Sequence, residues 1–288
     1  MNIKLEKWYI DFTSKKALGF YYIMCVSLGP FRFGLSGINH FDTMDSMKSC
    51  KFSRLKLRSF HALKMKNASF STTLKSASLH INHGLSQIQG TWKFLAPPQK
   101  RIHKPLYESG EGWCDWKVWT PKAKVEMVTK NNGNADRLEG TGYIDYVRFN
   151  LPPWKTPLRR LYWGRMHSED SWGVFMSLNC SDKSISIYMD PKSVEQDVSV
   201  LLNKGQLRTL PRFIWTIGSE HNSFLFDGKI FRTLENEEIL GKSRYLKLLP
   251  PFVRNKMNSS GCDEKFEIRT TFRGKEYQGI MEEVSWNV

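Results

Sequence analysis

The sequence predicts an all-β protein. Apolar and polar residues alternate with a period of two along most of the 288 residues, and Gly, Pro, Asn and Asp separate the alternating segments. Hydrophobic residues make up 40% of the chain and aromatic residues 13%, which is enough apolar mass for a packed core. Short strands with turn residues between them favour antiparallel sandwiches or barrels.

The expected strands follow one another from the first residues onward. In the first part of the chain they are 4–13, 19–28, 31–41, 50–60, 68–74, 76–82, 86–95 and 112–119. Beyond a break at Trp119-Thr120-Pro121 they are 122–129, 140–149, 159–167, 171–179, 184–189, 211–217, 222–231, 264–273 and 276–287. Asn131-Asn132-Gly133-Asn134 and Asp227-Gly228 are typical of hairpin turns. Two short helices are expected, at 191–204, where Pro191 suits a first helical position, and at 250–257.

The two parts of the chain resemble each other. Trp8-Tyr9-Ile10-Asp11-Phe12 opens the protein, and Gly142-Tyr143-Ile144-Asp145-Tyr146 stands near the start of the second part. An aromatic-rich strand follows each of these segments. We therefore expect two domains, residues 1–120 and 121–288, each forming an antiparallel β-barrel.

Several classes of protein and site are excluded. The longest apolar stretch, residues 18–33, is interrupted by Gly, Pro and Arg, and charges stand among the first residues, so a membrane span and a secretory signal are not expected. A cytoplasmic location is the expectation. Five scattered cysteines without C-x-x-C spacing predict reduced thiols and no zinc site. No metal site is expected, and no phosphate-binding glycine motif occurs in the sequence.

Positive charge is concentrated in the first part of the chain. The formal net charge is +15, and residues 1–130 contribute 21 Lys/Arg against 8 Asp/Glu. The segment 46–106 contains no acidic residue and 12 basic ones. A peripheral contact with an anionic membrane, an anionic ligand or a nucleic acid would explain this segment. The strand-like alternation and the lack of any nucleic-acid-binding motif argue against nucleic acid.

One set of residues has the chemistry to act on an alkene. Residues i and i+2 of a strand share a face, so Tyr143 and Asp145 lie together, as do Asp115, Lys117 and Trp119, and also Trp163, Arg165 and His167. Burial among aromatic rings raises the pKa of a carboxyl group, and a protonated acid beside aromatic faces is able to protonate a double bond. The alternative is that Asp145 pairs with Arg165 or Lys117 and only closes the barrel.

Motifs in the middle and at both ends of the chain resemble the AttH-like and carotenoid 1,2-hydratase (hydroxyneurosporene synthase) family. They are Trp119-Thr120-Pro121 with Ala123-Lys124-Val125-Glu126, Gly140-Thr141-Gly142-Tyr143-Ile144-Asp145, and Trp163-Gly164-Arg165. The opening Glu6-Lys7-Trp8-Tyr9-Ile10-Asp11 and the closing 282–286 are similar to the family's terminal strands, whereas residues 30–105 match no family motif.

The resemblance implies two lipocalin-like β-barrels packed together, of the calycin type, without a cofactor. It also implies catalytic roles for Asp145 as the acid, Tyr143 as its partner and Trp119 as the ring that stabilises a carbocation. Lys117 stands where the family has a histidine and is therefore the fourth catalytic candidate, and Tyr146-Val147-Arg148-Phe149 replaces the family's polar run. The candidate substrate-binding residues are Trp163, Arg165, Trp116 and Tyr146.

These expectations define the candidate functions. The first is a hydratase, or an isomerase, that binds an apolar isoprenoid, polyene or polyketide-like substrate. The alternatives are a carrier of a lipid-like ligand without catalysis, and a biosynthetic enzyme of the pericyclase type, which the family also includes. A basic β-protein that acts on nucleic acid or a membrane through residues 46–106 is a further alternative.

Overall fold

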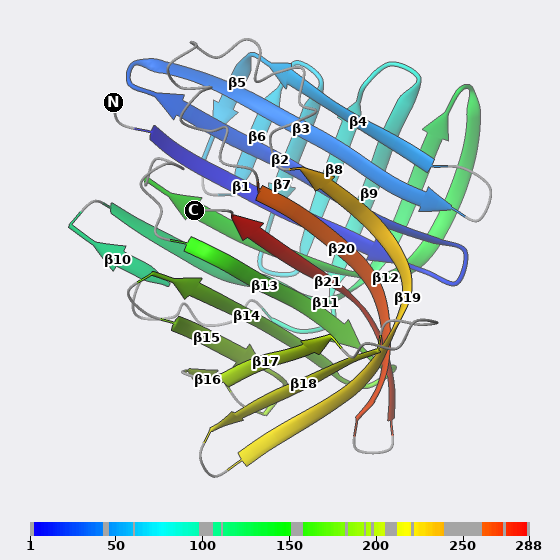
Figure 1. The fold of residues 1–288 in the computed structure, drawn as a ribbon. Coiled ribbons are helices and arrows are strands. Elements are labelled where there is room, and N and C mark those ends of the chain that lie inside the picture. The colour runs from blue at the N-terminus through cyan, green and yellow to red at the C-terminus, as the bar shows by residue number, and fades with distance from the viewer. Residues whose placement is uncertain are drawn as a thin grey trace. The chain divides into compact units, whose positions relative to one another are not determined.

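The computed structural model confirms that the protein is all-β (Figure 1). It describes residues 3–42, 46–59, 61–97, 106–110, 112–150, 158–181, 184–192, 194–196, 199–204, 212–219, 222–238, 261–272 and 275–286. Across these ranges every regular element is a β-strand. The chain divides into two compact units, Met1–Pro152 and Pro153–Val288.

The first unit contains one 12-stranded antiparallel sheet. Its strands are β1 (Ile3–Thr13), β2 (Ala17–Leu28), β3 (Phe31–Asp42), β4 (Ser46–Ser53), β5 (Leu55–Arg58), β6 (Ala62–Met65), β7 (Ala68–Thr72), β8 (Ser76–Asn82), β9 (Ser86–Phe94), β10 (Tyr107–Ser109), β11 (Gly112–Asn131) and β12 (Asn134–Phe149).

This sheet curls into a nearly closed barrel. The strand order is β4-β3-β2-β1-β12-β11-β9-β8-β7-β6-β5, so the first strand of the unit pairs with the last. The two edge strands, β4 and β5, are separated only by Arg54. In Figure 1 the blue strands β1–β3 lie across the cyan strands β6–β9, and β2 contacts β7 while β3 contacts β5 and β8. Its two halves therefore pack against each other around one core.

Apolar side chains of alternate residues fill the barrel interior. On β1 these are Trp8, Ile10 and Phe12, and on the adjoining β12 they are Ile144 and Tyr146. Because side chains alternate along a strand, the residues between them face the outside of the barrel. Tyr9, Asp11, Tyr143 and Asp145 are therefore on the outer face, yet all four are buried.

The second unit contains a nine-stranded antiparallel sheet with the same kind of connectivity. Its order is β16-β15-β14-β13-β21-β20-β19-β18-β17, and here too the first strand of the unit pairs with the last. The strands are β13 (Leu158–His167), β14 (Trp172–Cys180), β15 (Ser184–Met189), β16 (Val194–Gln196), β17 (Ser199–Lys204), β18 (Arg212–Ser219), β19 (Asn222–Glu238), β20 (Gly261–Phe272) and β21 (Lys275–Trp286).

The boundary between the units differs from the one expected at residues 120 and 121. Trp119-Thr120-Pro121 lies inside the continuous strand β11, whose register with β12 shifts between Val118 and Thr120 and again between Thr120 and Ala123. Proline has no N–H to donate to a ladder, and a bulge is where a strand tolerates it. The expected break is therefore an irregularity within one strand, and the compact units divide at Pro152 and Pro153.

The internal repeat also differs from the expected one. The segment 142–146 belongs to β12 and pairs directly with β1 of the same unit, Tyr9 opposite Asp145. The topological counterpart of β1 is β13, which contains Tyr162 and Trp163. The two units thus repeat a connectivity, and the short similarity between the two Tyr-Ile-Asp segments reflects two neighbouring strands.

The expected turns and helices are confirmed only in part. The hairpin at Asn131–Asn134 is confirmed, with positive φ at Asn132 and Gly133 as a type I′ turn requires, whereas Asp227-Gly228 lies within β19. The helix expected at 191–204 is wrong, because β16 and β17 pair with β15 and β18 there and sheet pairing overrides weak helical periodicity. The helix expected at 250–257 lies outside the described residues.

Among the described residues no helix is long and apolar enough to cross a membrane. The four cysteines whose side chains the structure describes are free thiols, and of these Cys25 is buried. The same ranges hold no group of three or more His, Cys, Asp or Glu side chains placed to bind a metal ion.

Candidate functional site

The candidate site is centred on Asp145, which lies on the outer face of the first unit's sheet. Strand β12 runs between β1 and β11, so Asp145 is opposite Tyr9 on one side and Val118 on the other. Its side chain is 3% exposed. The sequence predicted a carboxyl group buried among aromatic rings, and the structure buries Asp145 on the face of the sheet opposite to the barrel core.

Two neutral donors hold the Asp145 carboxyl group. The Tyr143 hydroxyl donates a hydrogen bond to Oδ2 at 2.9 Å, and Trp116 Nε1 donates to the same oxygen at 3.0 Å. Tyr143 and Trp116 are themselves buried. The predicted pair of Tyr143 and Asp145 is thus brought together, and Trp116, predicted as a substrate-binding residue, joins them.

Aromatic rings continue outward from this carboxyl group along the same face. The Tyr9 ring lies edge-on to Tyr143 with centroids 6.5 Å apart, and it stacks with Phe20 at 6.3 Å. The Lys7 ammonium is 5.6 Å from the centre of the Tyr9 ring. Sequence reasoning missed Tyr9 and Phe20 as site residues. The signal for Tyr9 was its place in the opening strand, but only the pairing of β1 with β12 connects it to Asp145.

A second buried carboxyl group supports the backbone next to Tyr143. Asp11 Oδ1 accepts a hydrogen bond from the Tyr143 backbone N–H at 2.9 Å, and the Asp11 carbonyl accepts one from Trp92 Nε1 at 2.8 Å. A Cβ atom on Gly142 would lie 2.4 Å from Trp92 Nε1 and 2.5 Å from the Asp11 carbonyl oxygen. The glycine before Tyr143 therefore allows β1, β12 and Trp92 to pack more closely than any side chain at this position would permit.

The other predicted catalytic residues lie on the opposite face. Trp119 belongs to the barrel core, where its ring is edge-on to Trp8 at 5.3 Å. Lys117 alternates to that same face, and its ammonium is 4.7 Å from the centre of the Trp119 ring. Tyr146 also packs on Trp8, and burial and then the charge of Glu6 raise the pKa of its hydroxyl. Lys117, Trp119 and Tyr146 are thus neighbours of one another, and the tryptophan that contacts Asp145 is Trp116.

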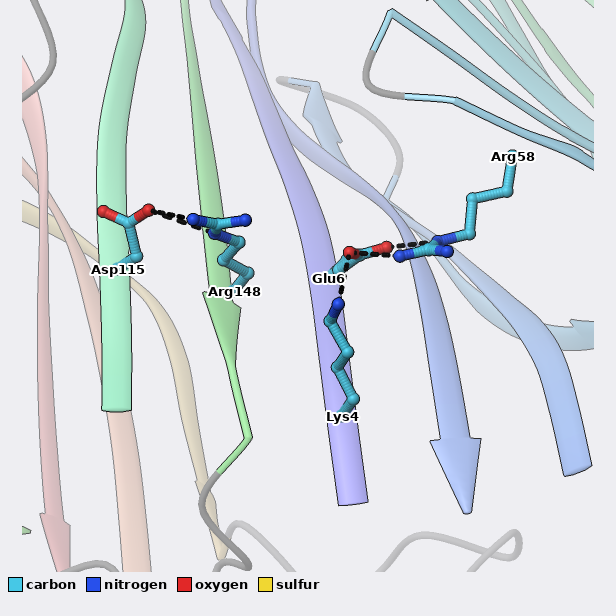
Figure 2. Close-up of polar contacts among 5 residues, drawn as sticks. All are labelled: Lys4, Glu6, Arg58, Asp115 and Arg148. Carbon is cyan, nitrogen blue, oxygen red and sulfur yellow. Dashed lines mark hydrogen bonds and ion pairs between the residues drawn. The ribbon is translucent and has the colours of Figure 1, made fainter. Parts of the chain in front are cut away.

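Ion pairs gather on the core-facing side of the strands at this end of the barrel (Figure 2). Glu6 on β1 accepts two hydrogen bonds from Arg58 on the edge strand β5, and Lys4 Nζ is 3.6 Å from Glu6. Partial burial alone would raise the pKa of Glu6, but Arg58 and then Lys4 outweigh it and lower that pKa. Arg148 Nε donates to Asp115 Oδ2 at 3.0 Å. These contacts stabilise the closure of the barrel.

The two remaining predicted site residues belong to the second unit. Trp163 and Arg165 are both buried on β13, and Arg165 shares a hydrogen bond with His167 two residues further on. The expectation that these three residues share one side of a strand agrees with that hydrogen bond. Their predicted role in binding a substrate stays a prediction.

Two buried histidines of the first unit are kept neutral. His40 Nδ1 is 2.8 Å from the Tyr21 hydroxyl, and burial lowers the pKa of His40 to about 4. His83 lies between the Ser36 and Ser49 hydroxyls at 2.9 and 2.8 Å. Burial, and then the charge of Lys51, lower the pKa of His83 to about 4. Both rings are neutral in the folded protein well below the pH at which an unfolded chain protonates them.

We expect the free energy of unfolding to fall as the pH is lowered from 6.5 to 5. The unfolded chain takes up protons on these histidines below about pH 6.5, whereas the folded protein takes them up only near their lowered pKa of about 4. For His40 alone this difference is worth about 2 kcal/mol at pH 5. Urea unfolding at several pH values measures it. His40→Gln should flatten the dependence, whereas His80→Gln, at an exposed position, should leave it unchanged.

Solved structures share this fold over almost the whole chain. CghA with Sch210972 has a TM-score of 0.66 at 12% identity, covering 98% of this chain and 88% of that one. A protein assigned as AttH (NE1406) from Nitrosomonas europaea has a TM-score of 0.67 at 10% identity, covering 98% and 92%. Kievitone hydratase from Nectria haematococca has a TM-score of 0.60 at 11% identity, covering 99% and 89%.

The chain matches no family model and no curated protein sequence. At 10–12% identity the structural likenesses establish the fold alone. The protein is therefore an all-β chain with the fold seen in a protein assigned as AttH and in a hydratase. The expected likeness to AttH-like proteins is supported at the level of fold.

Proposed function

We propose that this protein binds an apolar small molecule and hydrates or isomerises a carbon–carbon double bond by protonation from Asp145. The observation that carries the proposal is the buried carboxyl group of Asp145, whose Oδ2 accepts hydrogen bonds from both Tyr143 and Trp116. An acid in such a place is shielded from bulk water and fixed in orientation. No cofactor is needed for this reaction.

We assign the residue roles from the hydrogen bonds around Asp145. Because Tyr143 and Trp116 both donate to Oδ2, a proton on Asp145 resides on Oδ1, and the two donors fix its direction. Transfer of this proton to the alkene leaves a carbocation, which the faces of Trp116 and Tyr9 stabilise through their ring quadrupoles. A water molecule then adds to the cation and returns a proton to the Asp145 carboxylate, so the net reaction is addition of one water molecule.

The residue that replaces the family's histidine takes no direct part in this mechanism. Lys117, which stands at the position of the family's histidine, faces the barrel core and lies against Trp119. We therefore assign the charge-stabilising ring to Trp116 instead of Trp119. Lys117 and Trp119 act in this proposal as parts of the core behind β11. A role for Trp163 and Arg165 of the second unit in binding a substrate is a separate proposal, and the mechanism at Asp145 does not use it.

The substrate class rests on the surroundings of Asp145 and on the proteins that share the fold. Aromatic rings line its sheet face, which suits an isoprenoid, polyene or polyketide-like molecule. One protein of this fold is named for the hydration of kievitone, and another holds Sch210972. A carotenoid 1,2-hydratase-like reaction is the specific form of the proposal that the sequence motifs favour.

Incubation with candidate alkenes tests the proposal. Kievitone and an acyclic carotenoid are the first probes, and mass spectrometry should detect a product heavier by one water molecule, or an isomer of the probe. An isomer formed without proton exchange would instead favour the pericyclase alternative. Tight binding of these probes, measured by quenching of tryptophan fluorescence, without any product would favour the carrier.

A further inference from the structure

Three large apolar side chains are exposed around one end of the first unit's barrel. Phe31, at the turn between β2 and β3, is 72% exposed, Phe52 near the end of β4 is 40% exposed, and Leu57 on β5 is 51% exposed. Single exposed apolar residues are common on proteins, but a group of large ones marks an interaction surface.

Register and chain connectivity place these residues close together. Phe52 lies opposite Leu35 on β3, and its ring is 5.4 Å from that of Phe33, two residues beyond Phe31 on the same side of the strand. Arg54 alone links β4 to β5, and β5 contacts β3. Arg58 turns inward to Glu6, so the preceding Leu57 points outward.

Exposed cations alternate with these apolar side chains. Arg32 follows Phe31, Arg54 follows Phe52 by two residues, and Lys56 precedes Leu57. None of the three cations forms an ion pair within the part of the chain that the structure describes. We call Phe31, Arg32, Phe52, Arg54, Lys56 and Leu57 the basic apolar edge. It carries three positive charges and no negative charge of its own.

We propose that the basic apolar edge docks the first unit onto an anionic lipid surface. Arg32, Arg54 and Lys56 contact the headgroups, and Phe31, Phe52 and Leu57 enter the boundary between headgroups and acyl chains. Each basic residue near an anionic membrane contributes about 1 kcal/mol of attraction, and burial of the apolar side chains adds to it. This inference does not depend on the proposed chemistry at Asp145.

A lipid surface fits this edge better than a nucleic acid does. Binding to a nucleic acid is stabilised by many contacts with phosphates and by stacking of bases on aromatic rings. Leu57 has no ring to stack, and three large apolar side chains accompany only three cations here. Apolar side chains among basic residues are typical of proteins that bind at the membrane interface.

Sedimentation of the full-length protein with lipid vesicles tests the proposal. One set of vesicles contains phosphatidylcholine alone, and a second set also contains phosphatidylserine. We expect binding to the second set at least about tenfold tighter than to the first. The triple variant Arg32→Gln, Arg54→Gln, Lys56→Gln should lower the partition coefficient on the order of 100-fold. Phe31→Ser, Phe52→Ser and Leu57→Ser together should lower it at least about tenfold.

Leu95→Ser is the matched control. Leu95 is 62% exposed and follows β9, four strands from β5 in the sheet and at the end of β9 away from the turn that contacts β4, so vesicle binding should not change. All variants alter exposed side chains, and an unchanged melting temperature verifies their fold. The proposal is overturned if the wild-type protein does not bind anionic vesicles, or if either triple variant binds them as tightly as the wild type does. Binding to a nucleic-acid duplex without binding to any vesicle would also overturn it.

Discussion

Replacement of Asp145 by Asn is expected to leave the protein folded and lower its rate by about 10²–10⁴-fold, the usual contribution of a general acid. The amide oxygen takes the place of Oδ2 and still accepts the hydrogen bonds from Tyr143 and Trp116. The amide nitrogen takes the place of Oδ1, and its N–H protons are too weakly acidic to be transferred to an alkene. Kinetics with whichever probe is turned over, together with a melting curve, measures both properties.

Asp115→Asn is the control for this variant. Asp115 pairs with Arg148, so loss of its charge should affect stability and leave the rate unchanged. The opposite outcome at Asp145 would contradict the account. If Asp145→Asn lowers stability by about 3–5 kcal/mol, the carboxylate neutralises a buried cation and serves the fold. If the variant is both stable and fully active, Asp145 has neither role.

Replacement of Gly142 by Ala is expected to destabilise the first unit strongly. The new Cβ atom would lie 2.4 Å from Trp92 Nε1 and 2.5 Å from the Asp11 carbonyl oxygen, closer than real Cβ atoms approach. Backbone and a fully buried indole cannot move aside cheaply, so we expect a loss of about 3 kcal/mol. The melting temperature should fall by roughly 6–12 °C.

Gly110→Ala provides the comparison, because among the described residues no atom beyond its chain neighbours lies within 4 Å of its added Cβ. This variant should melt within about 2 °C of the wild type, as changes at open surface sites do. Equal melting temperatures for the two variants would mean that β1, β12 and Trp92 do not approach as closely as described. The same comparison distinguishes a packing role for the glycine motif from a role in binding a ligand.

Local pattern predicted most strands of the first unit and which residues share a face, but it merged parts of β4 and β5 into one strand at 50–60, divided β11 at Trp119-Thr120-Pro121, and missed β6 and β10. Tyr143 and Asp145 share a face, and so do Lys117 and Trp119, as residues two apart in a strand must. Which face enters the core depends on the register between strands, which a single sequence does not reveal. Val118 lies opposite Asp145, so Trp116, two residues before Val118, shares the face of Asp145 and reaches its carboxyl group. Trp119 lies on the other face of β11 and does not reach it.

Pairing between strands that are far apart in the sequence also explains the contact that was missed and the helix that was wrongly expected. The pairing of β1 with β12 places Tyr9 beside Asp145, although 136 positions separate them in the sequence. Nothing local to either segment indicates this contact. The expected helix at 191–204 failed for the same reason, since β16 and β17 gain their hydrogen bonds from strands elsewhere in the chain.

The most direct test of the central claim is the reaction carried out in deuterium oxide. If Asp145 protonates the substrate, its exchangeable proton is replaced by deuterium, and the wild-type product should carry a single deuterium atom bound to carbon. Asp145→Asn should form this product about 10²–10⁴-fold more slowly, while the same probe still quenches its tryptophan fluorescence on binding. A wild-type product without carbon-bound deuterium, or labelled product from the variant at the wild-type rate, would contradict the account.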